Sequence, residues 1–84
     1  MHYLYILHSL SLDKFYVGST SMSIEERLKK HLTNHDEFTS KAKDWVIVYY
    51  ESYNTIQLAY VRELQIKRWK SKKAINKLIN NIRV

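Results

Sequence analysis

Short apolar runs alternate along this chain with segments whose apolar residues recur at helical spacing. Tyr3–Leu7 is apolar without a break, and Phe15–Val17 follows after a polar connection with its turn at Asp13-Lys14. Both runs are typical of strands, and we expect them to pair as an antiparallel hairpin. Trp45–Tyr50 predicts a third strand. Because its apolar residues point to both faces, helices are expected on both sides of the sheet.

The first predicted helix begins at a capping box and ends near Thr33. Ser23 is the expected N-cap, with Glu26 three residues later. Apolar residues recur every four positions and form the core-facing side, at Ile24, Leu28 and Leu32. Arg27 and His31 lie one turn apart beside that side, on the border between core and solvent.

The second predicted helix starts at a cap, Asn54 or Thr55, and runs to about Lys70. Its apolar residues are less regularly spaced, at Leu58, Ala59, Val61, Ile66 and Trp69. The polar segment 34–44, before the third strand, predicts a surface loop or a short helix.

The last predicted helix runs from about Lys72 to Ile82, with Ser71 as its cap. Its apolar residues follow the i, i+3, i+4, i+7 rule, at Ile75, Leu78, Ile79 and Ile82. The predicted order is strand, strand, helix, strand, helix, helix. The length of 84 residues suits one domain, so residues 1–84 are expected to fold as a single unit.

Charge narrows the choice of partner. Lys and Arg number 14 against 8 Asp and Glu, and the formal net charge of +6 favours nucleic acid before a membrane surface. From Ser52 onward Glu63 is the only acid, among the bases Arg62, Lys67, Arg68, Lys70, Lys72, Lys73, Lys77 and Arg83.

The composition also indicates the cellular compartment in which the protein is expected. The chain has no cysteine, which excludes disulfides and thiolate metal sites and suits a reducing cytoplasm. Its longest apolar run is far shorter than the roughly 20 residues that span a bilayer, and its N-terminus lacks the features of a signal peptide. We therefore expect a cytoplasmic protein with no membrane partner.

Gly18 is the only glycine in a chain without proline. It is expected to end the second strand. Where a sequence otherwise avoids glycine, the position needs either a positive φ or a close approach of another group to its backbone. A plain strand terminator is the alternative.

The residues that are candidates for chemistry are Tyr5, Tyr16, Arg27, His31 and Glu63. Each also has an ordinary structural explanation, because buried tyrosines pack, isolated histidines are usually structural and helix arginines are usually solvated. Glu63, alone among cations, is either a charge-balancing residue or a Mg²⁺ ligand, since hard cations bind carboxylates.

The order of these residues is more specific than any one of them. Tyr3-Leu4-Tyr5 is followed by Tyr16-Val17-Gly18 eleven residues after Tyr5, then by Arg-x-x-x-His on the capped helix and by the late Glu63. This pattern, from Tyr3 to about Ile79, resembles the GIY-YIG nuclease superfamily, in particular its small stand-alone single-domain bacterial branch. That branch is similar to the N-terminal nuclease domain of the excinuclease that incises DNA in excision repair, and to phage homing endonucleases.

The resemblance implies an α+β fold, with a three-stranded antiparallel sheet flanked by helices on both faces in the order β-β-α-β-α-α. It implies an endonuclease that hydrolyses phosphodiester bonds of DNA with Mg²⁺ or Mn²⁺, in repair or recombination. RNA is the alternative substrate, and the protein is expected to be a monomer or a weak homodimer.

The resemblance also implies catalytic roles for individual residues. Tyr5 and Tyr16 match the motif tyrosines, and Glu63 matches the family's metal ligand. Arg27 matches the helix arginine, and His31 lies one turn later.

Two positions depart from the family's pattern. Tyr3 stands where the first motif has glycine, and Ser19 stands where the excision-repair excinuclease has lysine. The asparagine of some relatives has no certain counterpart, and Asn76 and Asn80 are the candidates.

A tyrosine acting as general base at neutral pH needs cations that lower its pKa from about 10. Arg27, His31 and the metal are expected to supply this lowering. Tyr5 is the favoured base, and Tyr16 then positions phosphate or water. His31 either relays the proton or orients Tyr5.

The residues expected to bind the nucleic acid backbone are Lys41, Lys43, Lys67, Lys70, Lys72 and Lys73. No recognition helix is evident, so selectivity for flaps, nicks or branches is expected rather than for sequence. Two alternatives stay open. One is a nucleic-acid-binding module that cuts poorly without a partner, and the other is a basic interaction protein whose candidate residues only pack.

Overall fold

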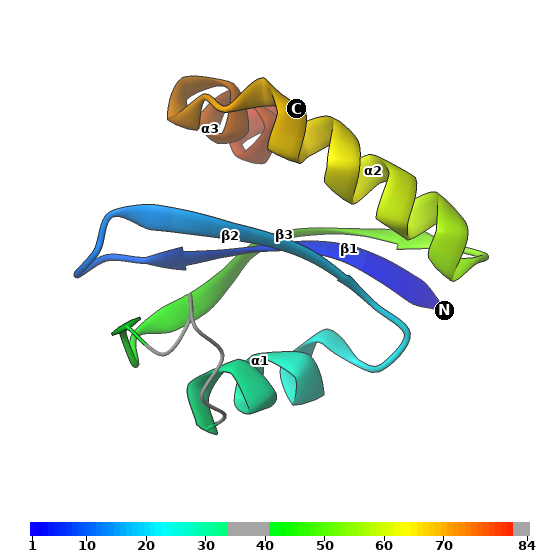
Figure 1. Cartoon of the computed structure of the whole chain (residues 1–84), viewed down its shortest axis with the longest axis horizontal. Helices are drawn as coiled ribbons and strands as arrows, with labels where there is room; N and C mark the ends of the chain where they lie inside the picture. Colours follow the sequence, from blue (N-terminus) through cyan, green and yellow to red (C-terminus); the bar gives the residue numbers. More distant parts are fainter. Residues whose placement is uncertain (34–40, 82–84) are drawn as a thin grey trace.

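The computed structural model describes residues 1–33 and 41–81 of the chain. Its elements, in order, are β1 (His2–Ser9), β2 (Lys14–Thr20), α1 (Ile24–Thr33), β3 (Trp45–Tyr53), α2 (Ile56–Trp69) and α3 (Lys72–Asn81). Helix α1 covers one face of the sheet, and α2 and α3 cover the other (Figure 1). The predicted α+β class, element order and two-sided covering are confirmed. Of the predicted loop, residues 34–40 lie outside the described residues.

The sheet is antiparallel with the order β2-β1-β3, so β1 lies in the centre. Residues Leu4–Leu7 of β1 are at most 1% exposed, because strands flank them and helices cover them. Their side chains alternate between two cores, as the period of a strand requires. Leu4 and Ile6 pack toward α2 and α3, whereas Tyr5 and Leu7 pack toward α1.

The sequence suggested that strand β2 ends at Gly18, but the structure contradicts this. The strand continues to Thr20, and Gly18 lies directly opposite Tyr5 in the ladder. Strand β3 is also less covered than predicted. Val46 is 53% and Tyr50 58% exposed, because β3 is an edge strand and a helix shields each face only in part.

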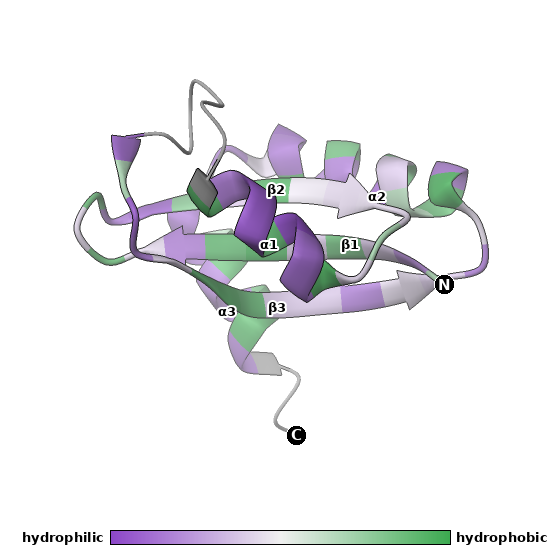
Figure 2. Ribbon diagram, turned by 90° about the horizontal axis from the view of Figure 1, so that it is seen from below, coloured by the Kyte–Doolittle hydropathy of each residue, from purple (hydrophilic) through white to green (hydrophobic). Residues whose placement is uncertain are grey.

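Each helix is capped at its N-terminus by a side-chain hydroxyl at a position that the sequence predicted. Ser23 Oγ accepts a hydrogen bond from the Glu26 amide of α1 at 3.2 Å. Thr55 caps α2, and Ser71 caps α3, each accepting from a first-turn amide at 3.2 Å. Helix α1 lies across the strands and carries mostly hydrophilic residues (Figure 2).

Helix α2 buries only part of its apolar set. Its buried residues are Ala59, Glu63 and Ile66, whereas Leu58 is 52% and Val61 51% exposed. The inward stripe therefore contains a carboxylate, which explains why the apolar pattern of this helix was irregular. Across residues 1–33 and 41–81, no helix has both the length and the apolar character that crossing a membrane requires.

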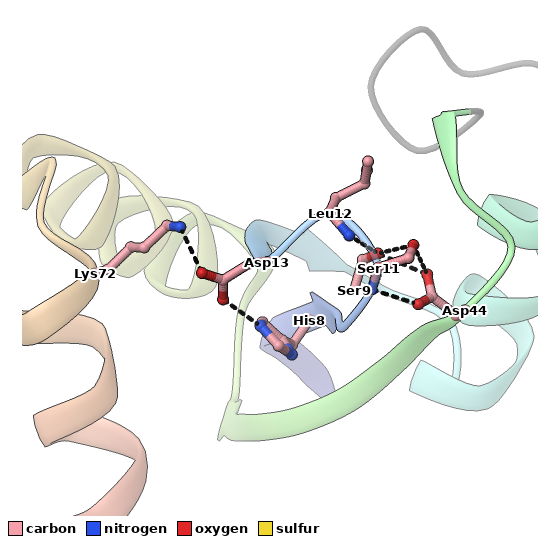
Figure 3. A network of polar contacts seen from close by, with 7 residues as sticks. All are labelled: His8, Ser9, Ser11, Leu12, Asp13, Asp44 and Lys72. Atoms are coloured by element: carbon pink, nitrogen blue, oxygen red, sulfur yellow. Dashed lines mark hydrogen bonds and ion pairs between the residues drawn. The ribbon is translucent and has the colours of Figure 1, made fainter.

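The β1–β2 turn is fixed at both sides (Figure 3). On one side, Asp44 accepts hydrogen bonds from Ser9 Oγ at 2.6 Å and from the Ser11 amide at 2.8 Å. On the other, Lys72 at the start of α3 donates to Asp13 at 3.2 Å. The turn therefore joins α3 to the segment that precedes β3.

Candidate active site

Tyr5 connects the central strand to helix α1 inside the core. Its side chain is 1% exposed, and its hydroxyl oxygen lies 2.9 Å from Nε2 of His31. The same oxygen accepts a hydrogen bond from Nε of Arg27 at 3.3 Å. The helical spacing of Arg27 and His31 thus brings both side chains to one phenol, as the sequence predicted.

Tyr16, from the edge strand β2, completes this group. Its ring packs edge-on against His31 with centroids 4.7 Å apart, and its centroid is 6.4 Å from that of Tyr5. Tyr16 and Arg27 are half-buried, whereas His31 is buried. We refer to Tyr5, Tyr16, Arg27 and His31 as the Tyr5 cluster.

Gly18 provides the space that the Tyr5 ring occupies. A Cβ at position 18 would lie 2.5 Å from the Tyr5 hydroxyl oxygen, 2.6 Å from its Cζ and 3.1 Å from Cε1 of Tyr16. Its φ is not positive. Of the explanations that the sequence left open, close approach is therefore the correct one.

Glu63 reaches β2 from the opposite side of the sheet. Its Oε1 accepts a hydrogen bond from Ser19 Oγ at 2.7 Å, and its Oε2 pairs with Nζ of Lys67 at 2.5 Å. Since Ser19 follows Gly18 in the strand, its side chain points away from the Tyr5 cluster. The structure thus groups four of the candidates and places the fifth on the α2 side of the same edge strand.

The electrostatics of Tyr5 differ from the sequence-based expectation. Burial raises the pKa of Tyr5 to about 12, and the charges of Tyr16 and Glu63 act in the same direction. The hydrogen bond and the charge of Arg27 oppose this rise without cancelling it. The expectation of a lowered pKa is wrong for the protein alone, because the sequence shows the neighbouring cations but not the loss of water around the phenol.

Comparison with models of protein families matches the GIY-YIG catalytic domain over residues 1–78. The chain belongs to the GIY-YIG family. This membership indicates a nuclease-type fold and nucleic acid as the substrate. No curated protein and no solved structure matches the chain, so the similarity to the excision-repair excinuclease stays a prediction.

The family implies a metal ion, and the donor chemistry of Glu63 fits one. Mg²⁺ commonly takes one or two carboxylates and completes its shell with water and substrate phosphate. Within the described residues no group of three acidic, His or Cys side chains is placed to hold a metal, so such an ion would rely on that mode. The ammonium of Lys67 already occupies a cation position on Oε2.

The predicted backbone-binding lysines of this GIY-YIG chain fall into separate places. Lys67 and Lys70 line a hollow of about 350 Å³ together with Tyr16, at the free edge of β2. Lys72 pairs with Asp13, and Lys73 is exposed on α3. Lys41 and Lys43 lie apart from this edge, and Nζ of Lys43 donates to the Leu32 carbonyl of α1.

Sequence reasoning missed Lys14 and Phe15, which line a second hollow beside Lys70. The available signal was a lysine followed directly by two aromatic residues at the start of β2. Asn76 and Asn80 are both exposed on α3. Among the described residues, neither makes a side-chain hydrogen bond or ion pair that would support the role of the family asparagine.

Proposed function

We propose that this GIY-YIG protein is an endonuclease that hydrolyses phosphodiester bonds of DNA with Mg²⁺ or Mn²⁺. Branched, flapped or nicked DNA is its proposed substrate, in repair or recombination within the cytoplasm. The observation that carries the proposal is the contact of one buried phenol with both Arg27 and His31, at the point where Gly18 leaves room for it. Packing alone does not require a guanidinium and an imidazole on the same hydroxyl.

In this proposal Arg27 binds the scissile phosphate. Phosphodiester hydrolysis needs an activated water, neutralised phosphate charge and support for the leaving oxygen. The planar guanidinium suits the non-bridging oxygens of a phosphate, and its Nε contact with Tyr5 fixes its orientation. Arg27 therefore couples the position of the phosphate to the position of the phenol.

Tyr5 and His31 act together in moving the proton. With its pKa raised to about 12, Tyr5 is protonated at neutral pH. Because Tyr5 is 1% exposed, substrate binding must open a path for the attacking water to its oxygen. The phenol then accepts the proton of the water as its own proton passes to Nε2 of His31, 2.9 Å away. His31 is thus the relay of the two roles considered for it, and Tyr16 positions water or phosphate beside it.

Glu63 is the proposed ligand of the metal ion. When bound, Mg²⁺ supplies charge neutralisation at the phosphate and at the leaving 3′ oxygen. Ser19 holds one oxygen of the carboxylate, and Lys67 holds the other. The side chain of Lys67 is 49% exposed, so it has room to release Oε2.

Cleavage of branched and linear DNA by the purified protein tests the proposal. We expect cutting with Mg²⁺, none with a chelator, and a preference for branched over linear duplex. Glu63→Gln preserves the shape of the side chain and should abolish cutting, whereas Glu25→Gln removes an exposed carboxylate on α1 and should leave it intact.

Metal-dependent cutting by Glu63→Gln at the wild-type rate would contradict the metal role. DNA binding without cutting under all these conditions would favour the binding module that depends on a partner. Absence of both binding and cutting would leave the basic interaction protein as the better description.

A further inference from the structure

Two neighbouring hollows beside strand β2 have lining residues in common. The first, of about 350 Å³, is lined by Tyr16 and Lys67, and the second, of about 230 Å³, by Lys14 and Lys72. They share the side chains of Phe15, Lys70 and Ile75. We call the whole the β2 groove. It leads from Tyr16 of the candidate active site to the start of α3.

The rim of the groove carries cations. Lys67 and Lys72 are compensated by Glu63 and Asp13 through partly exposed ion pairs. Within the described part of the chain, Lys14 and Lys70 make no ion pair, so their charges are available to a ligand. This favours an anionic occupant.

Lys70 carries a second signal. It ends α2 in the left-handed region at φ 48°, where glycine is the usual residue. A lysine held there at a conformational cost is the kind of outlier that points to function. Its side chain lines both hollows, so it lies at the boundary between them.

The floor of the groove is apolar. Phe15, Val17, Ile66 and Ile75 line it, and the Phe15 ring packs against His8 with centroids 4.8 Å apart. Duplex DNA keeps its bases stacked in its interior and offers only phosphates and groove edges to such a surface. A single strand offers bases as well, and an aromatic floor with a cationic rim is how proteins hold single strands.

We infer that the β2 groove binds the single-stranded segment next to the scissile phosphate, with an unpaired base on Phe15 and its backbone along Lys70 and Lys14. The inference rests on the proposed function and names its substrate class: DNA with an unpaired flank at the cut. Lys67 lines the groove and pairs with Glu63, the proposed metal ligand, so a strand in the groove passes beside that part of the candidate site.

Binding measured in a chelator tests this without cleavage. Fluorescence anisotropy compares labelled oligothymidylate of about 12 nucleotides with an abasic strand of the same length and with a duplex. The wild-type protein should bind the oligothymidylate about fivefold or more tighter than the abasic strand, because only the former can stack. Equal affinities would overturn the inference, and so would absence of binding. This comparison needs no variant to fold.

Variants distinguish the contribution of the apolar floor to binding from that of the cationic rim. Phe15→Leu should lower oligothymidylate affinity and leave abasic binding unchanged, and Phe15→Tyr should restore the preference. Lys70→Gly suits the left-handed backbone and should unfold no more easily than wild type, yet bind both strands more weakly. Its salt dependence should fall by about 0.7 in log–log slope. Lys77→Gln, on α3 outside the groove, should change none of these.

The outcomes distinguish this inference from the proposed function. Preference for bases without cleavage in Mg²⁺ would support the groove and contradict the endonuclease. Cleavage without any preference for bases, together with unchanged binding in Phe15→Leu, would support the endonuclease and overturn the groove.

Discussion

The two sides of the edge strand β2 hold their parts of the candidate site in opposite ways. On the α1 side, Tyr5 is almost completely buried and is fixed by Arg27 and His31, in the space that Gly18 leaves free. On the α2 side, Glu63 is held by one hydroxyl and by a lysine whose side chain is half exposed. Folding assembles the first part, whereas a ligand can rearrange the second.

This difference separates two kinds of sensitivity. Changes on the α1 side should affect stability and rate together, because the same contacts serve the core and the chemistry. Changes at Lys67 on the α2 side should mainly alter the response to metal, because its ammonium is half exposed and Ser19 still holds the buried Glu63 when that ion pair is lost. The following variants test this division.

Arg27→Lys should have the largest effect. It keeps the positive charge and the helix, but it removes the planar guanidinium and the Nε donor to Tyr5. We expect the cleavage rate to fall by about 10²–10³-fold. Lys30→Arg, at an exposed position of the same helix, is the matched control for a charge-conserving exchange and should cleave normally. A wild-type rate for Arg27→Lys would mean that the contact serves packing only.

Gly18→Ala should damage both stability and rate. The added Cβ meets the buried Tyr5 ring at 2.5 and 2.6 Å, so the ring must shift. Overpacking of this kind costs about 1–3 kcal/mol, which urea unfolding would measure. Displacing the phenol should also slow cleavage by about 100-fold.

A second background shows whether that clash is the cause. In Tyr5→Leu, Gly18→Ala should cost clearly less free energy of unfolding, because the ring that the Cβ strikes is gone. The same cost in both backgrounds would mean that the backbone at position 18, and not the phenol, requires glycine.

Lys67→Met should have a smaller effect, confined to the metal response. The ammonium competes with Mg²⁺ for Oε2 of Glu63. At saturating DNA, the Mg²⁺ concentration for half-maximal cleavage should therefore fall by about two- to fivefold. The free energy of unfolding should change by less than about 0.5 kcal/mol. Lys77→Met is the control, and a higher Mg²⁺ requirement in Lys67→Met would show that Lys67 assists metal binding.

The smallest effect concerns alkaline stability. The folded protein raises the pKa of Tyr5 to about 12, while an unfolded phenol titrates near 10. The folded state keeps a proton that the unfolded state loses, so this contribution is complete below about pH 10 and declines as pH rises toward 12. Denaturant unfolding from neutral pH to about pH 11 should show a shallower decline for Tyr5→Phe than for wild type. Because burial also raises the pKa of Tyr49 and Tyr53 to about 12, only the difference between the two proteins reports on Tyr5.

Most of the fold could be predicted from local sequence patterns. Period-four spacing and the Ser23 cap predicted α1, and Ser71 predicted the start of α3. The predictions that failed concerned which strand faces are covered by other elements. The apolar residues of Trp45–Tyr50 do not show that β3 is an edge strand, since that depends on which strand pairs with β1.

The candidate site was predictable as a list of residues more than as an arrangement. Spacing along α1 placed Arg27 and His31 on one side, but only the strand register shows that Gly18 faces Tyr5. The sign of the Tyr5 pKa shift was missed because it depends on burial. The β2 groove was missed because Phe15 and Lys70 meet only after α2 and α3 pack on the sheet.

The anchored β1–β2 turn affects how the protein can be labelled. Leu10 is 82% exposed, and an exposed hairpin tip is a usual place to insert a tag. Here an insertion would separate Ser11 from Asp44 and Asp13 from Lys72. A fluorophore is better attached at the exposed position of Lys30 on α1, which leaves both anchors in place.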